Sequence, residues 1–159
     1  MNAAPRRPSM TRDEFLDWVQ AQEGRYEFDG FQPVAIPGST ADHSQICQNI
    51  WFALRTRLRG SGCIVLGAGA GLATVGDAVR YPDALVTCAK PPGSALLVPG
   101  VVVVFEVLSP TSGHADRIDK LREYRAVLSI RRYVIVEHLT PALLCSRGPK
   151  AQPIGPPPR

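Results

Sequence analysis

The stretch VVVVFEVL, residues 101–108, decides the fold of this chain. Seven of its eight residues are apolar, and five of them are valine. Valine favours extended backbone because its branched side chain packs well on a pleated surface. A run without polar alternation is typical of a strand that is covered on both faces. We therefore predict that residues 101–108 form the central strand of a sheet.

Segments on both sides of this strand have the patterns of helices and shorter strands. Thr11 followed by Glu14 predicts a capping box that starts a helix over residues 11–23. Apolar residues at every fourth position predict a helix over residues 40–59, and a further helix is expected over residues 115–127. Other strands are expected at residues 25–28, 32–36, 84–88, 132–137 and 142–145, and one is expected to begin near Cys63.

Glycines mark the turns between these segments. Asp29-Gly30 predicts a tight turn that joins the first two strands into a hairpin. The segment GAGAGLATVG, residues 67–76, lacks the lysine of a phosphate-binding loop and the strand-helix context of a dinucleotide fingerprint. We therefore predict a glycine-rich strand and turn there.

The length of 159 residues fits one domain with a single core. We predict an α/β fold in which a mixed central β-sheet is flanked by α-helices, over residues 11–145. Residues 1–10 are expected to form a flexible arm with nothing to pack against. Residues 146–159, with the sequence SRGPKAQPIGPPPR, are too rich in proline to continue a sheet, so we expect a disordered tail.

The composition is that of an ordinary globular protein, with 45% apolar and 20% charged residues. The net charge of +4 permits a polyanionic partner without requiring one. The sequence contains no apolar run of membrane-spanning length and no signal-peptide core, so we expect a cytoplasmic protein that does not contact membranes. The four cysteines form no C-x-x-C pair, and we expect buried thiols in a reducing compartment.

Two acidic residues lie where the surrounding sequence predicts burial. Glu106 lies inside the central strand, where an unpaired carboxylate would cost several kcal/mol. Asp83 follows Pro82 and precedes an apolar strand. The simpler explanations are a partner arginine or a solvent-facing position at the strand's end for Glu106, and a turn-capping role for Asp83. Two acids at the ends of neighbouring strands are also the arrangement that a hard cation such as Mg²⁺ requires.

Blocks of residues around these acids resemble the Uma-two family, a bacterial group of restriction-endonuclease-like proteins in the PD-(D/E)XK nuclease superfamily. The blocks are Tyr81-Pro82-Asp83; FEVLSP at residues 105–110; Asp116, Arg117, Lys120 and Tyr124; RYEFDG at residues 25–30; and His43. The resemblance covers residues 11–137. It implies a restriction-endonuclease-like fold and a Mg²⁺-dependent endonuclease that hydrolyses phosphodiester bonds of nucleic acid, with DNA as the expected partner and Mn²⁺ as a possible substitute ion.

The same resemblance implies roles for individual residues. Asp83 and Glu106 would hold the metal ion, and Glu27 would be a further catalytic acid. Lys120 would replace the lysine that the superfamily carries two positions after the strand acid, where this chain has Leu108. The remaining expected site-lining residues are His43, Asp116 and Tyr124. A solvated Lys120, a surface Glu27 and a helix-capping His43 are the alternatives.

Departures from the family pattern keep other functions open. Besides Leu108, the chain has Gly69 where related sequences carry an aspartate, and it leaves the pattern after Leu144. One alternative is therefore a catalytically degenerate binding or accessory protein with the nuclease fold. Another is a metal-dependent hydrolase of a small phosphorylated substrate. Because no DNA-reading motif is present, target specificity would come from the shape of the site, a homodimer or a partner protein.

Overall fold

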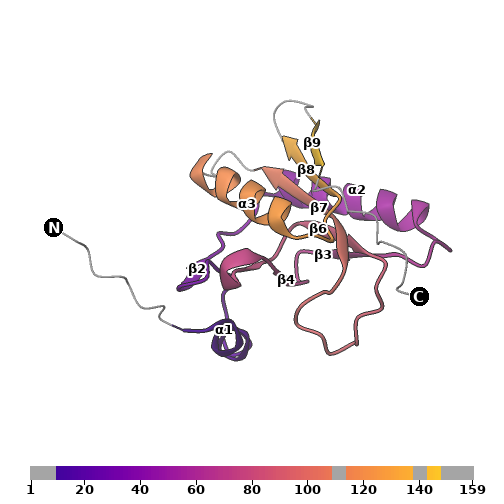
Figure 1. Cartoon of the computed structure of the whole chain (residues 1–159). Coiled ribbons are helices and arrows are strands. Elements are labelled where there is room, and N and C mark those ends of the chain that lie inside the picture. Colours follow the sequence, from indigo (N-terminus) through magenta and orange to yellow (C-terminus); the bar gives the residue numbers. More distant parts are fainter. Residues whose placement is uncertain (1–9, 109–113, 138–142, 148–159) are drawn as a thin grey trace, which may run out of the picture.

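The computed structural model describes residues 10–108, 114–137 and 143–147, which form three α-helices, one 3-10 turn and nine strands in two sheets (Figure 1). The helices are α1 (Arg12–Val19), α2 (Ala41–Arg57) and α3 (His114–Ala126), and the 3-10 turn η1 spans Val75–Asp77. The strands are β1 (Tyr26–Phe28), β2 (Pro33–Ala35), β3 (Ile64–Gly67), β4 (Leu72–Ala73), β5 (Val79–Arg80), β6 (Ala84–Thr87), β7 (Val101–Leu108), β8 (Arg132–Glu137) and β9 (Leu143–Arg147).

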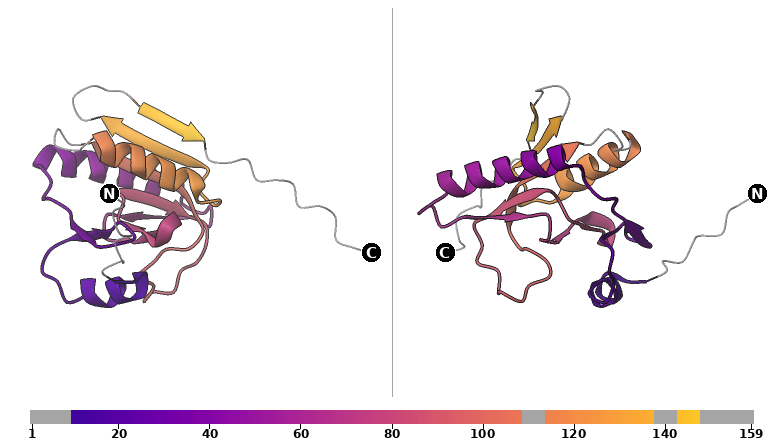
Figure 2. Two further views of the ribbon diagram at one scale, coloured as in Figure 1. Left: turned by 60° about the vertical axis from the view of Figure 1, so that its left-hand side comes forward. Right: turned by 180° about the vertical axis from the view of Figure 1, so that it is seen from behind.

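The larger sheet is mixed and has β7 at its centre, in the order β3-β6-β7-β8-β9. β7 pairs antiparallel with β6 and parallel with β8. A cluster around Val86 packs against α2, and a separate cluster around Leu85 includes Tyr124 of α3. Figures 1 and 2 show these two helices on opposite faces of the sheet. The predicted central strand, with both faces covered, is therefore confirmed.

The smaller sheet has the order β2-β1-β5-β4 and is covered by α1. Phe15 of α1 stacks on Phe28 of β1, with ring centroids 5.1 Å apart, and both side chains are fully buried. Thr11 and Glu14 form the predicted capping box, but α1 ends at Val19, earlier than expected. The sequence did not predict β5, because a two-residue strand carries too little periodicity to be recognised, whereas β4 falls within residues 67–76, where a glycine-rich strand and turn were expected.

The turn between β1 and β2 is held by Asp29 and Gly30. The Asp29 carboxylate accepts hydrogen bonds from the backbone N–H groups of Phe31 and Gln32. Gly30 has φ +93°, a conformation that side-chain-bearing residues rarely adopt, and a Cβ atom there would collide with the Gly76 carbonyl oxygen. The predicted turn residues are thus required for this hairpin to approach η1.

Two of the cysteines form a disulfide, between Cys63 and Cys88. The prediction of free buried thiols is wrong for this pair. Ile64 pairs with Thr87 in the antiparallel register of β3 and β6. Cys63, which precedes Ile64, therefore lies opposite Cys88, which follows Thr87. Strand register, which a count of sequence spacings does not reveal, brings the two sulfur atoms together. Cys47 is a free thiol.

The expected domain boundaries fall partly outside the described residues. The arm at residues 1–9 and the segment 148–159 lie beyond them. β9 pairs antiparallel with β8 and continues to Arg147, so the sheet extends two residues past the expected domain end at residue 145. Within the described ranges, the helices are too short or too polar to cross a lipid bilayer.

Candidate functional site

Asp83 and Glu106 lie at the same end of the larger sheet. Because Ala84 pairs with Phe105, the residue that precedes β6 lies beside the carboxyl end of β7. The Asp83 carboxylate accepts a hydrogen bond of 2.7 Å from the backbone N–H of Val107. This bond fixes Asp83 to the strand that carries Glu106.

Glu106 is buried and is held by two residues of α3. The Tyr124 hydroxyl donates a hydrogen bond of 2.9 Å to Glu106 Oε1, and Lys120 Nζ lies 3.6 Å from the same oxygen. Burial raises the pKa of Glu106 to about 7, although the positive charge of Lys120 opposes the shift. The negative charges of Asp83 and Glu27 raise the pKa further. Near neutral pH, Glu106 therefore exists in both its protonated and its ionised form. A cation bound beside it would favour the ionised form.

Glu27 on β1 connects this site to a second set of buried charges. Its Oε1 accepts from Lys120 Nζ at 3.2 Å and from the Tyr81 backbone N–H at 3.2 Å. Its Oε2 pairs with Arg80 Nη1 at 3.1 Å. Lys120 thus lies between the carboxylates of Glu27 and Glu106. The alternatives of a solvated Lys120 and a surface Glu27 do not hold, because the Lys120 side chain is 14% exposed and that of Glu27 is 8% exposed.

Arg80, which sequence reasoning missed, is the centre of that second set. Its guanidinium makes two hydrogen bonds to Glu123, at 2.7 and 2.8 Å, besides the pair with Glu27. The Thr74 hydroxyl also donates to Glu123. Burial opposes the positive charge, but the two carboxylates outweigh burial and raise the pKa of Arg80. Arg80 lies in a two-residue strand and its partner Glu123 is 43 positions away, so no local sequence pattern singled it out.

His43 reaches the site from the first turn of α2. Its Nε2 lies 3.1 Å from the Val107 carbonyl oxygen and 3.4 Å from Asp83 Oδ2. Its Nδ1 lies 3.6 Å from the sulfur of Cys47, one helical turn further along. Burial raises the pKa of the Cys47 thiol to about 12, and the charge of Asp83 and a hydrogen bond to it add to the shift. The helix cap is made by Thr40, whose hydroxyl accepts from the His43 backbone N–H, so the His43 ring is available to the site.

The remaining expected site residues divide into two groups. Tyr124, expected only to line the site, directly contacts Glu106. Asp116 belongs to α3, but its side chain lies outside the described part of the structure. Cys47 was not expected at the site, although its spacing of four residues from His43 on a predicted helix was a signal for it.

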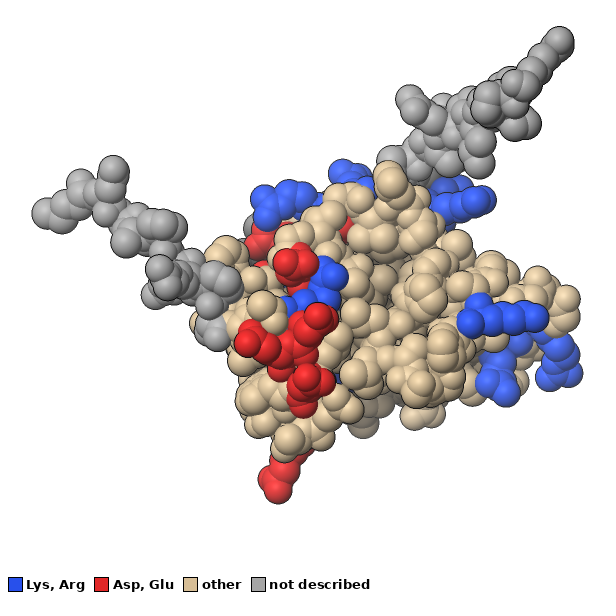
Figure 3. All heavy atoms as spheres, turned by 60° about the horizontal axis from the view of Figure 1, so that its bottom comes forward, with Lys and Arg blue, Asp and Glu red and all other residues tan. Residues whose placement is uncertain are grey.

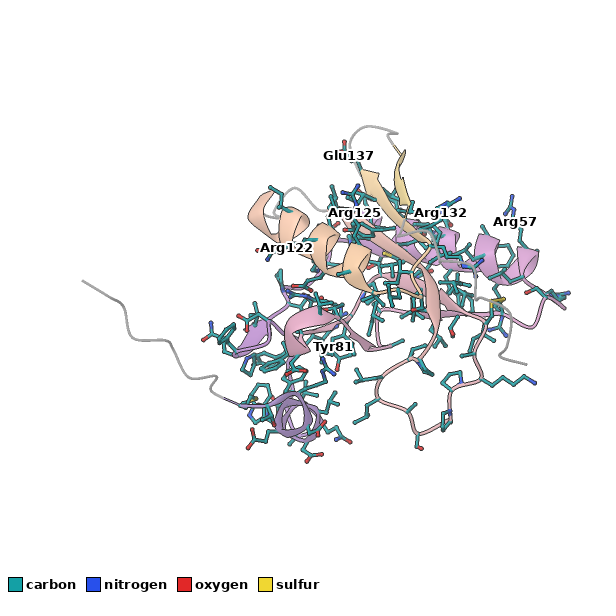
Figure 4. All side chains as sticks on the ribbon, viewed as in Figure 1. Arg57, Tyr81, Arg122, Arg125, Arg132 and Glu137 are labelled. Carbon is teal, nitrogen blue, oxygen red and sulfur yellow. A yellow bond between two sulfur atoms is a disulfide. The ribbon has the colours of Figure 1, made fainter. Side chains whose placement is uncertain are left out.

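Charged surface residues are distributed unevenly around this centre. Figure 3 shows acidic side chains gathered over the region of α1, whereas basic ones lie at the opposite end, along the upper edge and beside the acidic group. Arg57 marks that basic end in Figure 4. Arg55, Arg59 and Lys90 line an open pocket of about 670 Å³ between the end of α2 and the start of β3. Arg55 also stacks over the Trp51 ring, at 5.0 Å from its centroid.

Comparisons with known proteins add to this geometry. A family model named Uma2, described as "Putative restriction endonuclease", matches residues 12–157. The chain is 27% identical to the uncharacterized protein slr1290 of Synechocystis sp. over 132 residues, which cover 81% of this chain and 69% of that protein. It is also similar to the crystal structure of a protein from Anabaena variabilis, described as a putative nuclease belonging to DUF820. The TM-score is 0.73 at 16% identity, with 89% of this chain and 81% of the other covered.

These findings test two of the expectations from sequence. The structural likeness confirms the restriction-endonuclease-like α/β fold. The expectation that the chain leaves the family pattern after Leu144 is wrong, because the family match continues to residue 157.

Proposed function

Because the chain belongs to the Uma2 family, whose description is that of a restriction endonuclease, we propose that it is a metal-dependent nuclease that hydrolyses phosphodiester bonds of DNA. The observation that carries the proposal is the convergence of Asp83, Glu106 and Lys120 at one end of the central sheet. Two carboxylates and a lysine are the groups that phosphodiester hydrolysis needs for metal binding and charge stabilisation.

The residues present fit a hard divalent cation. Asp83 and Glu106 offer carboxylate oxygens from neighbouring strands, and the Asp83 carboxylate is hydrogen-bonded to the backbone N–H of Val107, the residue after Glu106. Asp83 and Glu106 would therefore hold Mg²⁺, with Mn²⁺ as a substitute. A bound ion would supply polarisation of a phosphate oxygen and a lower pKa for a water molecule.

The other residues would orient the substrate and balance its charge. Lys120, held between Glu27 and Glu106, would offset negative charge that develops on the phosphate. In this arrangement α3 supplies the lysine that β7 lacks at Leu108. Tyr124 would keep Glu106 in one orientation through its hydroxyl. A DNA partner and a cytoplasmic location, where chromosomal and invading DNA are accessible, belong to the same proposal.

We expect the purified protein to cut supercoiled plasmid or single-stranded DNA in the presence of Mg²⁺ or Mn²⁺, and to stop cutting when EDTA removes the ion. Gel electrophoresis of the products measures this directly, and readdition of the ion in excess should restore cutting. Cutting that persists after exhaustive chelation would contradict the metal requirement. A folded protein that never cuts DNA would favour the degenerate or small-substrate alternatives.

The basic pocket at the end of α2 supports a polymer as the substrate. Arg55 lies twelve positions after His43 on α2. At a rise of about 1.5 Å per residue, the pocket is roughly 18 Å along the helix from the site. This distance corresponds to about five nucleotides at 3.4 Å each. A DNA backbone bound at the site is thus long enough to reach Arg55, Arg59 and Lys90.

Charge reversal at this pocket should weaken DNA binding without removing the metal site. We expect the double variant Arg55→Glu/Arg59→Glu to lose about two phosphate contacts, so the slope of log affinity against log salt should fall by about two. Fluorescence anisotropy over a range of salt concentrations measures the slope. The matched control, Arg122→Glu/Arg125→Glu, makes the same change in net charge on α3. An equal loss of slope in both variants would show a general charge effect and no contact at the pocket.

A further inference from the structure

His43, Cys47 and Asp83 form a compact group of potential metal ligands, here called the His-Cys-Asp cluster. One nitrogen, the sulfur and one carboxylate oxygen all lie within 4.8 Å of one another. His43 and Cys47 are four residues apart and so share one face of α2, while Asp83 comes from the start of β6. The His43 and Asp83 side chains are 13% and 16% exposed, so the cluster is largely enclosed but open to a small ion.

The hydrogen bonds of His43 leave its Nδ1 free to act as a ligand. Nε2 lies 3.1 Å from the Val107 carbonyl oxygen, which can only accept a hydrogen bond, so the ring proton lies on Nε2. The lone pair on Nδ1 then points toward the Cys47 sulfur. Histidines that bind metals commonly donate their other ring N–H to a backbone carbonyl or a carboxylate. His43 has this arrangement already.

We propose that the His-Cys-Asp cluster binds zinc, with His43 Nδ1, Cys47 Sγ and a carboxylate oxygen of Asp83 as three ligands and the fourth position open. A thiolate and an imidazole favour zinc over magnesium, which prefers oxygen ligands. Tetrahedral bonds of about 2.0–2.3 Å separate ligand atoms by roughly 3.3–3.8 Å. His43 Nδ1 and Cys47 Sγ, 3.6 Å apart, already have this separation, so rotation of the Asp83 side chain is the movement that binding requires.

Charge and protons balance in this site. The thiolate and the carboxylate together carry two negative charges, which neutralise Zn²⁺. The thiol proton of Cys47 passes to solvent when the sulfur binds the ion, as metal-binding cysteines require. Three protein ligands and one open position are typical of catalytic zinc sites, where water or a substrate oxygen occupies the fourth position. The open position would take a water molecule or a phosphate oxygen.

The zinc site stands independently of the proposed magnesium site, with which it shares one ligand, Asp83. Glu106 is not a member of the cluster, although it is required for the proposed magnesium site. The two proposals can therefore fail separately. If both hold, the two ions compete for Asp83, and zinc should inhibit cleavage that depends on magnesium.

Cobalt(II) is the probe for this test, because a bond between cobalt and a thiolate gives an intense charge-transfer absorption in the near ultraviolet. We expect one equivalent of Co²⁺ to produce this band in the wild-type protein with its disulfide intact, and one equivalent of Zn²⁺ to displace it. Cys47→Ser should abolish the band and weaken zinc binding by more than about 100-fold, since loss of a residue that only supports a ligand already costs about 10- to 100-fold; competition with a chromophoric chelator measures the affinity. Cys145→Ser is the matched control and should keep the band.

The Glu106→Gln variant separates this proposal from the nuclease proposal. It should retain the cobalt band while losing magnesium-dependent cleavage. A wild-type protein that binds no cobalt, or a Cys47→Ser variant that keeps the band, would overturn the zinc site whether or not the protein cuts DNA. A protein that shows the band and never cuts DNA would leave the zinc site standing and overturn the nuclease.

Discussion

Replacing Glu106 with glutamine should abolish cleavage and, at the same time, make the metal-free protein more stable at pH 8. Glutamine keeps the size of the side chain and can still accept the Tyr124 hydrogen bond, but it removes the charge that a metal ion needs. We expect cleavage to fall at least 100- to 1,000-fold, the scale on which loss of one preorganised electrostatic group slows an enzyme. Lys120 keeps Glu27 as a partner in the variant, so no new unpaired charge is created.

The gain in stability follows from the raised pKa of Glu106. Its folded-state pKa is about 7, against 4.5 for an unperturbed glutamate, so the folded protein holds this proton more tightly than the unfolded chain does. The stability linked to this proton is fully present below about pH 4.5 and is lost as the pH rises through about 7. Ionised Glu106 then costs the fold on the order of 3 kcal/mol, a cost that glutamine does not carry.

Urea denaturation with EDTA present, at pH values on both sides of this window, measures the difference in the free energy of unfolding. The variant and the wild type should differ little from this cause at pH 4, and the variant should be the more stable at pH 8. Glu23→Gln, a change at an exposed position, is the matched control and should show neither effect. A Glu106→Gln variant that cuts DNA normally would remove Glu106 from the site.

The fold was predictable from the sequence wherever an element is long enough to show a clear apolar pattern. The valine-rich run at residues 101–108 predicted the bounds of β7, and apolar residues at every fourth position predicted α2. Both patterns are visible in the sequence because the buried face of each element requires apolar residues. β5 was missed because two residues cannot express a period, and pairing with β1 and β4 holds it in place. The Cys63–Cys88 disulfide was missed for a related reason, since it depends on the register of two strands.

Only some residues of the candidate site were predictable from the sequence. Asp83, Glu106 and Lys120 could be singled out because acids beside apolar strands need partners and because their spacing matches a family. The partnership of Arg80 with Glu123 joins residues 43 positions apart, and no local pattern reports it. The involvement of Cys47 was available from its helical spacing to His43. A single cysteine one helical turn after a histidine matches no C-x-x-C pattern, so cysteine spacing alone does not single it out.

Removing Arg80 should be the most destabilising single change at this site. Its guanidinium is 7% exposed and neutralises two buried carboxylates, Glu27 on β1 and Glu123 on α3. In Arg80→Met the Glu123 carboxylate loses the partner with which it makes two hydrogen bonds. We expect a loss of roughly 3–5 kcal/mol in the free energy of unfolding, as for other broken buried ion pairs. Chemical denaturation at neutral pH measures this loss.

A second substitution decides whether the loss comes from stranded charge or from lost packing. In Arg80→Met/Glu123→Met the unpaired carboxylate is gone, and Glu27 retains Lys120, so we expect most of the stability to return. Arg80→Lys should fall between the two, because lysine keeps the charge but cannot make the paired hydrogen bonds to Glu123. If the double variant is as unstable as Arg80→Met, packing around the guanidinium and not charge balance holds α3 against the smaller sheet. Because Lys120 lies on the same helix, the position of the proposed catalytic lysine then also depends on that packing.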